Sequence, residues 1–231
     1  APAPEGRPGF IRIDSVHQGD FDGTKGLYHI NAVDCVTQWQ VVASVQAISE
    51  AHLLSVIEEM LAQFPFEILG FHADNGSEYV NHKVARLLEK LRIEFTRSRP
   101  RRSNDNGLAE TKNGAVVRKI FGYEHIPQRH AARFNTFCAE YLNPFLNLHR
   151  PCLFATELPD AKKPGRIKRV YRPQDAMTPL DKLASLPDAA AFLREGVTLE
   201  ELHQLARALT DVQAAQELNE DGEPFGPELD V

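Results

Sequence analysis

The sequence has 231 residues, of which 42% are hydrophobic and 25% are charged, a composition that excludes wholesale disorder. Its apolar runs are far shorter than the roughly 20 residues that cross a bilayer, and its start, APAPEGRPGF, has neither an apolar signal core nor an initiator Met. Cys35, Cys138 and Cys152 form no C-x-x-C pair, which argues against a disulfide framework and a structural zinc site. We therefore expect a cytoplasmic protein without a membrane partner, trimmed at its N-terminus.

The net charge of −6 is unevenly distributed along the chain. Residues 184–231 carry 11 acids and only two arginines, so the rest of the chain has a small excess of positive charge. The bases gather in two clusters, which are Arg97, Arg99, Arg101 and Arg102, and then Lys162, Lys163, Arg166, Lys168, Arg169 and Arg172. Two basic patches on a nearly neutral body indicate a polyanionic partner, which the acidic C-terminal region would repel.

Alternating and β-rich runs at residues 10–16, 27–33 and 39–45 predict a three-stranded antiparallel meander. Helical periodicity then begins at residue 50 and continues to residue 64, with Ser49 as a candidate N-cap and Pro65 beyond its end. The following elements are predicted to be a strand at 66–72, a helix at 81–91, a strand at 93–96, a helix from about 104 past 119, and a helix at 131–148.

This order of elements predicts an α/β fold, with one domain built around a mixed sheet. The expected parts are an N-terminal tail (1–9), the core domain (10–150), a basic proline-containing arm (151–187), a C-terminal helical region (188–220) and an acidic tail (221–231). In the helical region Thr198 and Glu201 predict a capping box that starts one helix through Asn219, whose leucine stripe needs a partner surface in the chain or on another copy.

Three carboxylates stand out by their positions in these elements. Asp14 interrupts the first strand, Asp74 follows the strand at 66–72 in HADNGSEY, and Glu110 lies near a helix start in SNDNGLAETKNG. Taken singly, each has a plain structural reading, as a strand-edge charge, a turn residue and a solvated acid in a first helical turn. Asp74 and Glu110 are separated by 35 residues.

Together these motifs resemble the DDE integrase and transposase superfamily, specifically the retroviral-type integrase core and its bacterial insertion-sequence branch. The resemblance covers residues 11–183 and includes HINAVDCVT, NLHRPC and MTPLDKL. It implies an RNase H-like fold with a five-stranded mixed sheet, catalytic and metal-binding roles for Asp14, Asp74 and Glu110, and two Mg²⁺ or Mn²⁺ ions. It also implies DNA as the substrate, 3′-end hydrolysis and strand transfer as the reactions, a homodimer or higher oligomer, and a bacterial enzyme that acts at the nucleoid.

DNA contacts are predicted at the two basic clusters and beside Glu110. The candidates are Arg97, Arg99, Arg101, Arg102, Asn106, Lys112, Lys168 and Arg169. Each cluster keeps an alternative, because a solvated basic loop, or an arm packed on its own core, would look the same in sequence. Asn106 has a helix-capping role as its alternative.

Other polar residues are assigned structural roles. Asp34 matches a family position, but we expect it to stabilise a turn, and Glu78 is either a substrate contact or, more simply, a solvated residue at a helix start. Trp39 is expected to anchor a core or an interface.

The chain departs from the retroviral pattern in two ways. Gly114 and Val117 occupy positions where retroviral cores carry DNA-gripping lysines, and no zinc-binding or helix-turn-helix segment precedes residue 10, so we expect a catalytic fragment. Two alternatives stay open, a stand-alone metal-dependent nuclease of the same fold and a non-catalytic DNA-binding relic.

Overall fold

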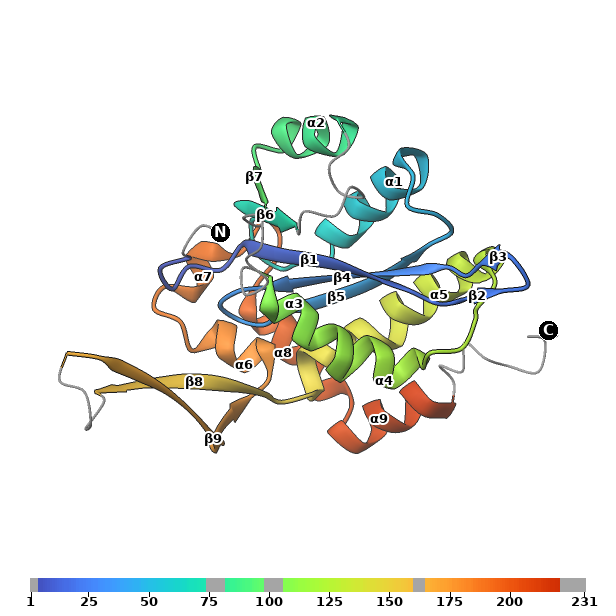
Figure 1. Cartoon of the computed structure of the whole chain (residues 1–231). Helices are drawn as coiled ribbons and strands as arrows, with labels where there is room; N and C mark the ends of the chain where they lie inside the picture. Colours follow the sequence, from blue (N-terminus) through green and yellow to red (C-terminus); the bar gives the residue numbers. More distant parts are fainter. Residues whose placement is uncertain (1–3, 74–81, 98–105, 160–164, 221–231) are drawn as a thin grey trace.

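The computed structural model describes residues 4–73, 82–97, 106–159 and 165–220, and its centre is one mixed sheet (Figure 1). The sheet has five strands in the order β5-β4-β1-β6-β7. Their bounds are Phe10–His17 for β1, Tyr28–Asp34 for β4, Gln40–Val45 for β5, Gly70–Ala73 for β6 and Glu94–Arg97 for β7. A small hairpin, β2 (Asp20–Phe21) and β3 (Thr24–Lys25), extends the turn between β1 and β4.

The first three long strands form the predicted antiparallel meander, and the last two add in parallel to β1. Strand β4 pairs antiparallel with both β1 and β5, whereas β1 pairs parallel with β6 and β6 pairs parallel with β7. This strand order and these directions are those of the RNase H-like sheet, which confirms the predicted fold class.

Helices cover both faces of the sheet. Helices α1 (Glu50–Leu61) and α2 (His82–Lys90) lie on one side. The other side carries a continuous helix made of α3 (Gly107–Lys112), the π-helical segment η3 (Asn113–Val117) and α4 (Arg118–Phe121). It is followed by the short turn η4 (Gln128–His130), α5 (Ala131–Phe137), and the π-helical segments η5 (Cys138–Leu142) and η6 (Phe145–His149).

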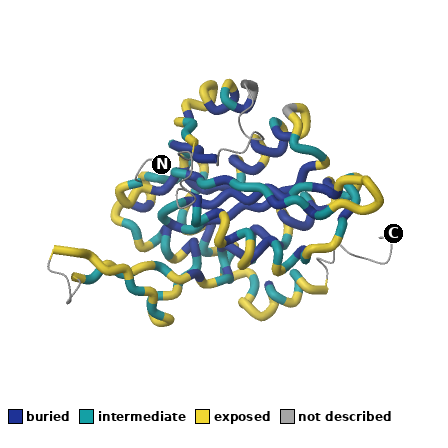
Figure 2. Tube along the Cα trace, in the orientation of Figure 1, coloured by how far each residue is buried: buried dark blue, intermediate teal, exposed yellow. Residues whose placement is uncertain are grey.

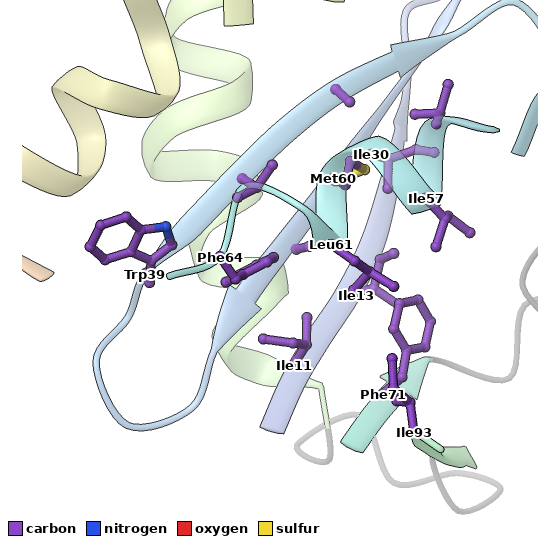
Figure 3. Close-up of a cluster of buried hydrophobic side chains, with 14 of the residues drawn as sticks. Ile11, Ile13, Ile30, Trp39, Ile57, Met60, Leu61, Phe64, Phe71 and Ile93 are labelled. Atoms are coloured by element: carbon purple, nitrogen blue, oxygen red, sulfur yellow. The ribbon is translucent and has the colours of Figure 1, made fainter. Parts of the chain in front are cut away.

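Alternation along the strands sends apolar side chains into two separate cores. Figure 3 shows the core between the sheet and α1, where Ile11, Ile13 and Ile30 meet Ile57 and Met60. Trp39 is 5% exposed and packs edge-on against Phe66 with ring centroids 6.4 Å apart, which confirms its role as a core anchor. The second core lies beneath the opposite helices and includes Val16, Val42, Val116, Phe134 and Leu142.

Three asparagines cover the outer edge of β5. The side-chain amide of Asn143 accepts from the Val42 amide at 2.9 Å and donates to the Val42 carbonyl at 3.1 Å. Asn135 makes the same pair of bonds with Ser44, and Asn147 makes it with Gln40. Because an open edge strand exposes a row of unpaired backbone groups, these amides take the place of a further strand.

The predicted proline-containing arm is a long antiparallel hairpin of β8 (Cys152–Pro159) and β9 (Ile167–Met177). It projects away from the sheet and helices, and most of its length is exposed (Figures 1 and 2). Helices α6 (Pro179–Ala184) and α7 (Ala189–Phe192) return the chain to the body.

The single C-terminal helix predicted from Thr198 to Asn219 is wrong, because the chain forms two helices there, α8 (Leu199–Ala208) and α9 (Asp211–Glu220). The capping box of Thr198 and Glu201 is present as predicted. A second pair of the same kind interrupts the helix, since the Gln213 amide donates to Thr210 Oγ1 and Gln213 Oε1 accepts from the Thr210 amide.

Two further details differ from the predicted elements, namely the cap of α1 and the start of β6. Helix α1 starts after Ser49, but the Ser49 hydroxyl contacts His52 Nδ1 instead of capping the helix. The strand predicted at 66–72 shortens to β6, which begins at Gly70.

No helix in the described part of the chain is long and apolar enough to span a bilayer.

Candidate active site

Asp14 lies in the central strand β1, on the sheet face that α3 and η3 cover. It pairs with Asn31 across the β1–β4 ladder. Its Oδ1 accepts from the Ser15 amide at 2.8 Å, and its Oδ2 accepts from Asn113 Nδ2 at 2.7 Å. The carboxylate is therefore a half-buried hydrogen-bond acceptor on a rigid strand, where its position is well defined.

Strand β6 ends beside Asp14. The parallel register pairs Ile13 with Ala73, the residues that immediately precede Asp14 and Asp74. Asp74 and Glu78 themselves lie outside the described residues, and their predicted roles stay predictions. On the same strand His72 Nδ1 contacts Thr96 Oγ1 of β7 at 2.8 Å, which ties this end of the sheet together.

Glu110 lies in the first turn of α3, with its side chain exposed. Its backbone amide bonds to the Asn106 carbonyl at 3.3 Å. The Asn106 side chain is 1% exposed and donates to the carbonyl of Ile13 at 3.0 Å, so the start of α3 is fastened to β1 one residue before Asp14. Asn106 Oδ1 is buried without a hydrogen-bond partner among the described residues. The side-chain capping bond weighed for Asn106 is not formed.

A chain of amides also fastens α3 and η3 to the sheet. Asn31 Nδ2 donates to the Ala109 carbonyl at 3.1 Å and to Asn113 Oδ1 at 2.9 Å, and Asn31 Oδ1 accepts from Gln40 Nε2 at 2.8 Å. Asn113 opens the π-helical turn η3, a local widening that is frequent at functional sites. The helix carrying Glu110 and the strand carrying Asp14 are thus held together by side-chain amides.

These amides are functional candidates that sequence reasoning missed. Asn31 stands among apolar residues in the strand HINAVD, and Asn113 follows Glu110 by one helical turn. A polar residue in a buried strand and a polar residue on the same helical face as Glu110 were the available signals. Their hydrogen bonds depend on the packing of η3 against β4, which the sequence pattern does not specify.

The described residues contain no group of three or more His, Cys, Asp or Glu side chains that could hold a metal. Two of the three predicted metal ligands, Asp14 and Glu110, lie in this part of the chain. Both are carboxylates, the hard oxygen donors that Mg²⁺ and Mn²⁺ prefer. The donor chemistry therefore fits the predicted metal.

The predicted DNA-binding residues divide by exposure. Arg97 is exposed at the end of β7, where its guanidinium lies 5.6 Å from the Phe95 ring centroid. Lys168 and Arg169 are exposed on the hairpin, and Arg169 Nε pairs with Glu157 Oε1 at 3.1 Å. Lys112 is 7% exposed and donates from Nζ to Cys152 Sγ at 3.0 Å, so its side chain is turned inward like that of Asn106. Arg99, Arg101 and Arg102 lie outside the described residues.

Asp34 has the structural role that the sequence predicts. It is fully buried, and it accepts from the Gly9 amide at 2.8 Å, the Val36 amide at 3.0 Å, and both the amide and hydroxyl of Thr37 at 2.8 Å. Burial raises the pKa of Asp34, and the hydrogen bonds from Thr37, Gly9 and Val36 oppose that rise. The carboxylate organises the turn between β4 and β5.

Residues 6–103 match the family model of the integrase core domain. The resemblance predicted from the sequence is thereby confirmed. The matched segment includes Asp14 and Asp74 and ends before Glu110.

A protein of Sinorhizobium fredii (strain NBRC 101917 / NGR234), the uncharacterized protein y4rM, is 26% identical over 167 residues. The match covers 72% of this chain and 47% of the relative, so the chain spans about half the length of the curated relative it matches.

Among solved structures, the simian T-cell lymphotropic virus intasome in complex with PP2A regulatory subunit B56 gamma is 21% identical, with a TM-score of 0.43, covering 50% of this chain and 41% of that chain. The catalytic core domain of BIV integrase is 16% identical, with a TM-score of 0.41, and the match covers 50% of this chain and 70% of that chain. The HTLV-2 integrase catalytic core domain in complex with magnesium is 16% identical, with a TM-score of 0.40, and the match covers 49% of this chain and 69% of that chain.

Proposed function

We propose that the chain is the catalytic core of a DDE transposase or integrase, which hydrolyses DNA at a 3′ end and joins that end to a second DNA. The observation that carries the proposal is the match of residues 6–103, a segment that includes Asp14 and Asp74, to the integrase core domain. The amides that fasten α3 and η3 to β1 and β4 support a common site for Asp14 and Glu110.

The chemistry of DNA strand transfer suits a set of three carboxylates. A phosphodiester is already anionic, and in-line attack adds negative charge to its oxygens. When bound, two divalent ions would activate the attacking hydroxyl and stabilise the leaving oxygen. Asp14, Asp74 and Glu110 would hold the ions, and no covalent bond to the protein is needed. The rigid strand under Asp14 keeps its carboxylate in place throughout.

DNA would contact exposed lysine and arginine side chains on both sides of this site. Arg97 lies where β7 leads into the arginine-rich loop, and Lys168 and Arg169 lie on the projecting hairpin. Lysine and arginine contacts to phosphates fix the register of a protein on DNA without reading its sequence. We assign these contacts to DNA positioning, along with Arg99, Arg101 and Arg102. Asn106 and Lys112 would act at DNA only if their side chains turned outward.

The complete protein would act as a homodimer or higher oligomer on two DNA partners. Joining an element end to a target requires the two DNA molecules to be held at once. The chain spans about half the length of the curated relative that it matches. In a full-length protein of that kind, the remaining part would recognise the DNA ends of the element.

The alternatives predict different products from one experiment. The chain is incubated with supercoiled plasmid and a labelled short duplex bearing a free 3′-hydroxyl, in Mg²⁺ or Mn²⁺. Label joined to plasmid is the expected result, and it should be lost in Glu110→Gln and retained in Glu89→Gln, which changes an exposed acid on α2. Nicks without joined label would favour the stand-alone nuclease, and no product would favour the DNA-binding relic. Either result would contradict the proposal.

A further inference from the structure

The β8–β9 hairpin has one face that is exposed along its described length. The ladder pairs Pro159 with Ile167 and Glu157 with Arg169, and side chains alternate between the two faces of a strand. These four residues therefore share a face, which we call the outer face. It includes the exposed residues Leu153, Glu157, Pro159, Ile167, Arg169 and Tyr171.

Large apolar side chains are concentrated on this outer face. Leu153 is 47% exposed, Tyr171 is 59% exposed and Ile167 is 68% exposed. Eight large hydrophobic side chains are exposed in the described part of the chain, and these three lie together on a hairpin that projects from the body (Figure 1). Exposed apolar side chains gathered in this way indicate a surface that binds a partner.

The charge of the hairpin favours a polyanion as that partner. The basic residues of its described part are Arg166, Lys168, Arg169 and Arg172. Its two acids, Glu157 and Asp175, both have partners within the hairpin. Glu157 Oε1 accepts from Arg169 Nε at 3.1 Å, and Asp175 Oδ2 accepts from Thr156 Oγ1 at 2.8 Å. The phosphates of DNA offer the complementary charge.

The strand edges of the hairpin are poorly suited to pairing with another chain. Because β8 and β9 form a two-stranded sheet in the described part of the chain, each strand has an open edge. Pro159 and Pro173 have no amide hydrogen to donate, and Lys168 adds a charge, which are features that discourage pairing with a further strand. The outer face, and not a strand edge, is therefore the contact surface.

A two-stranded ribbon has the dimensions to enter a groove of double-stranded DNA. Lysine and arginine side chains of such a ribbon contact phosphates, while its apolar side chains contact the base pairs. Ile167 and Pro159 lie opposite one another in the last pair of the ladder, where β8 ends and β9 begins. Isoleucine and proline are residue types that proteins insert between base steps, where they unstack the bases and bend the duplex.

We propose that the hairpin lies in a groove of double-stranded DNA and inserts Ile167, supported by Pro159, between two base pairs. Arg169 on the outer face and Lys168 on the opposite face reach phosphates on the two sides of the groove, and Tyr171 extends the apolar contact along the ribbon. The inference rests on the proposed function for DNA as the ligand, and it adds that the hairpin favours DNA that is easily bent. It does not involve the metal or the carboxylates.

The test compares two duplexes of equal length, one fully paired and one with a central two-base mismatch that is easier to unstack. Fluorescence anisotropy with the metal-free chain gives each Kd, and energy transfer between dyes at the duplex ends reports the bend. We expect the wild type to bend the DNA and to bind the mismatched duplex about 10-fold more tightly. Ile167→Ala should bind both duplexes with similar affinity and bend neither.

Val212→Ala is the matched control, because Val212 is a β-branched side chain on α9 that is also 68% exposed. It should keep the bend and the preference of the wild type. A preference for the mismatched duplex that is equal in Ile167→Ala and Val212→Ala would overturn the inference, and so would wild-type binding without a bend.

Sedimentation of the same variants tests the other possible partner, a second copy of the chain. A lower mass for Ile167→Ala, with an unchanged preference for the mismatched duplex, would show that the outer face binds that copy and would overturn the inference. Failure of the proposed function gives a different result. A chain that bends DNA through Ile167 but joins no DNA in metal would contradict the proposed function and support the inference, whereas a chain that joins DNA without bending it would do the reverse.

Discussion

Ile13 pairs with Ala73 in parallel register, so strands β1 and β6 each lead from this pair to an aspartate in the next position, Asp14 and Asp74. Adjacent parallel strands lie about 4.8 Å apart. We expect Asp14→Asn and Asp74→Asn each to lower metal-dependent DNA joining at least about 100-fold, because each removes the negative charge of a proposed metal ligand. Product formation on labelled DNA measures the effect, and thermal unfolding shows whether each variant stays folded.

Glu89→Gln provides the control for these two variants, since it removes one exposed acid from α2 without touching the site. Joining activity retained in either aspartate variant would remove that residue from the proposed metal site.

Because His29 is buried, we expect the fold to lose stability at acidic pH. Burial, with a smaller effect of the nearby Arg118, lowers its pKa to about 3 from an ordinary value of 6.5. The unfolded chain therefore binds a proton between these pH values that the folded chain excludes, so stability rises with pH across this window. The contribution of His29 to the free energy of unfolding should fall by about 1.4 kcal/mol for each pH unit below 6.5, and it should be constant above that pH.

Urea unfolding at several pH values between 7 and 4.5 measures this dependence. In His29→Phe the free energy of unfolding should depend less steeply on pH, by the equivalent of about one proton. The reason is that a phenyl ring, which does not titrate, would stack against Phe121 in place of the imidazole. A His29→Phe slope equal to that of the wild type would contradict the assignment.

Because asparagines cover the edge of β5, we expect Asn143→Leu to destabilise the fold strongly, although the two side chains are similar in size. Asn143→Leu leaves the amide and carbonyl of Val42 without their side-chain partners at a buried edge. We expect a loss of about 2–4 kcal/mol in the free energy of unfolding and a greater tendency to aggregate through the opened edge. Urea unfolding and light scattering measure both effects, with Asn219→Ala on exposed α9 as the control; a loss below about 1 kcal/mol would show that the edge does not need Asn143.

The hairpin predicts a salt-dependent contribution to DNA affinity. Reversing the charge of Lys168 and Arg169 should weaken DNA binding and flatten the dependence of log Kd on log salt by about one unit or more. Fluorescence anisotropy in a salt series measures the slope, and Arg207→Glu, on exposed α8, should have a smaller effect. An unchanged slope would show that the hairpin does not contact phosphates.

The same measurement tests the arginine-rich loop. Charge reversal of Arg101 and Arg102 should also flatten the slope, and an effect equal to that of Arg207→Glu would contradict a phosphate contact there.

Strand alternation was sufficient to predict the antiparallel meander within a mixed sheet, whereas the five-stranded RNase H-like sheet was implied by the family resemblance. The apolar periods of Ile11, Ile13 and Ile30 place one core, and the short polar turn after Asp34 forces the antiparallel meander. The sequence predicts the hairpin only as an arm, because prolines flank and interrupt β9 and are not typical of a paired strand. The break between α8 and α9 was missed because Thr210 and Gln213 form a capping pair in an otherwise continuous apolar stripe.

The candidate site was predictable only in its charged members. Asp14 and Glu110 stand out by motif and spacing, whereas Asn31, Asn113 and Gln40 acquire a role only when η3 packs over β4. Lys112 illustrates the opposite case, since a base beside Glu110 suggests a DNA contact in sequence, while the fold turns its ammonium toward Cys152.

The reversal of strand transfer on a branched DNA tests the central claim most directly, because this substrate mimics one transferred end and does not depend on recognition of the element's ends. The labelled branched DNA is incubated with the chain in Mg²⁺ or Mn²⁺, alongside Glu110→Gln. We predict metal-dependent resealing of the target strand with release of the end, and loss of both in the variant. Cleavage without resealing, or resealing that persists in Glu110→Gln, would contradict transesterification by Asp14, Asp74 and Glu110.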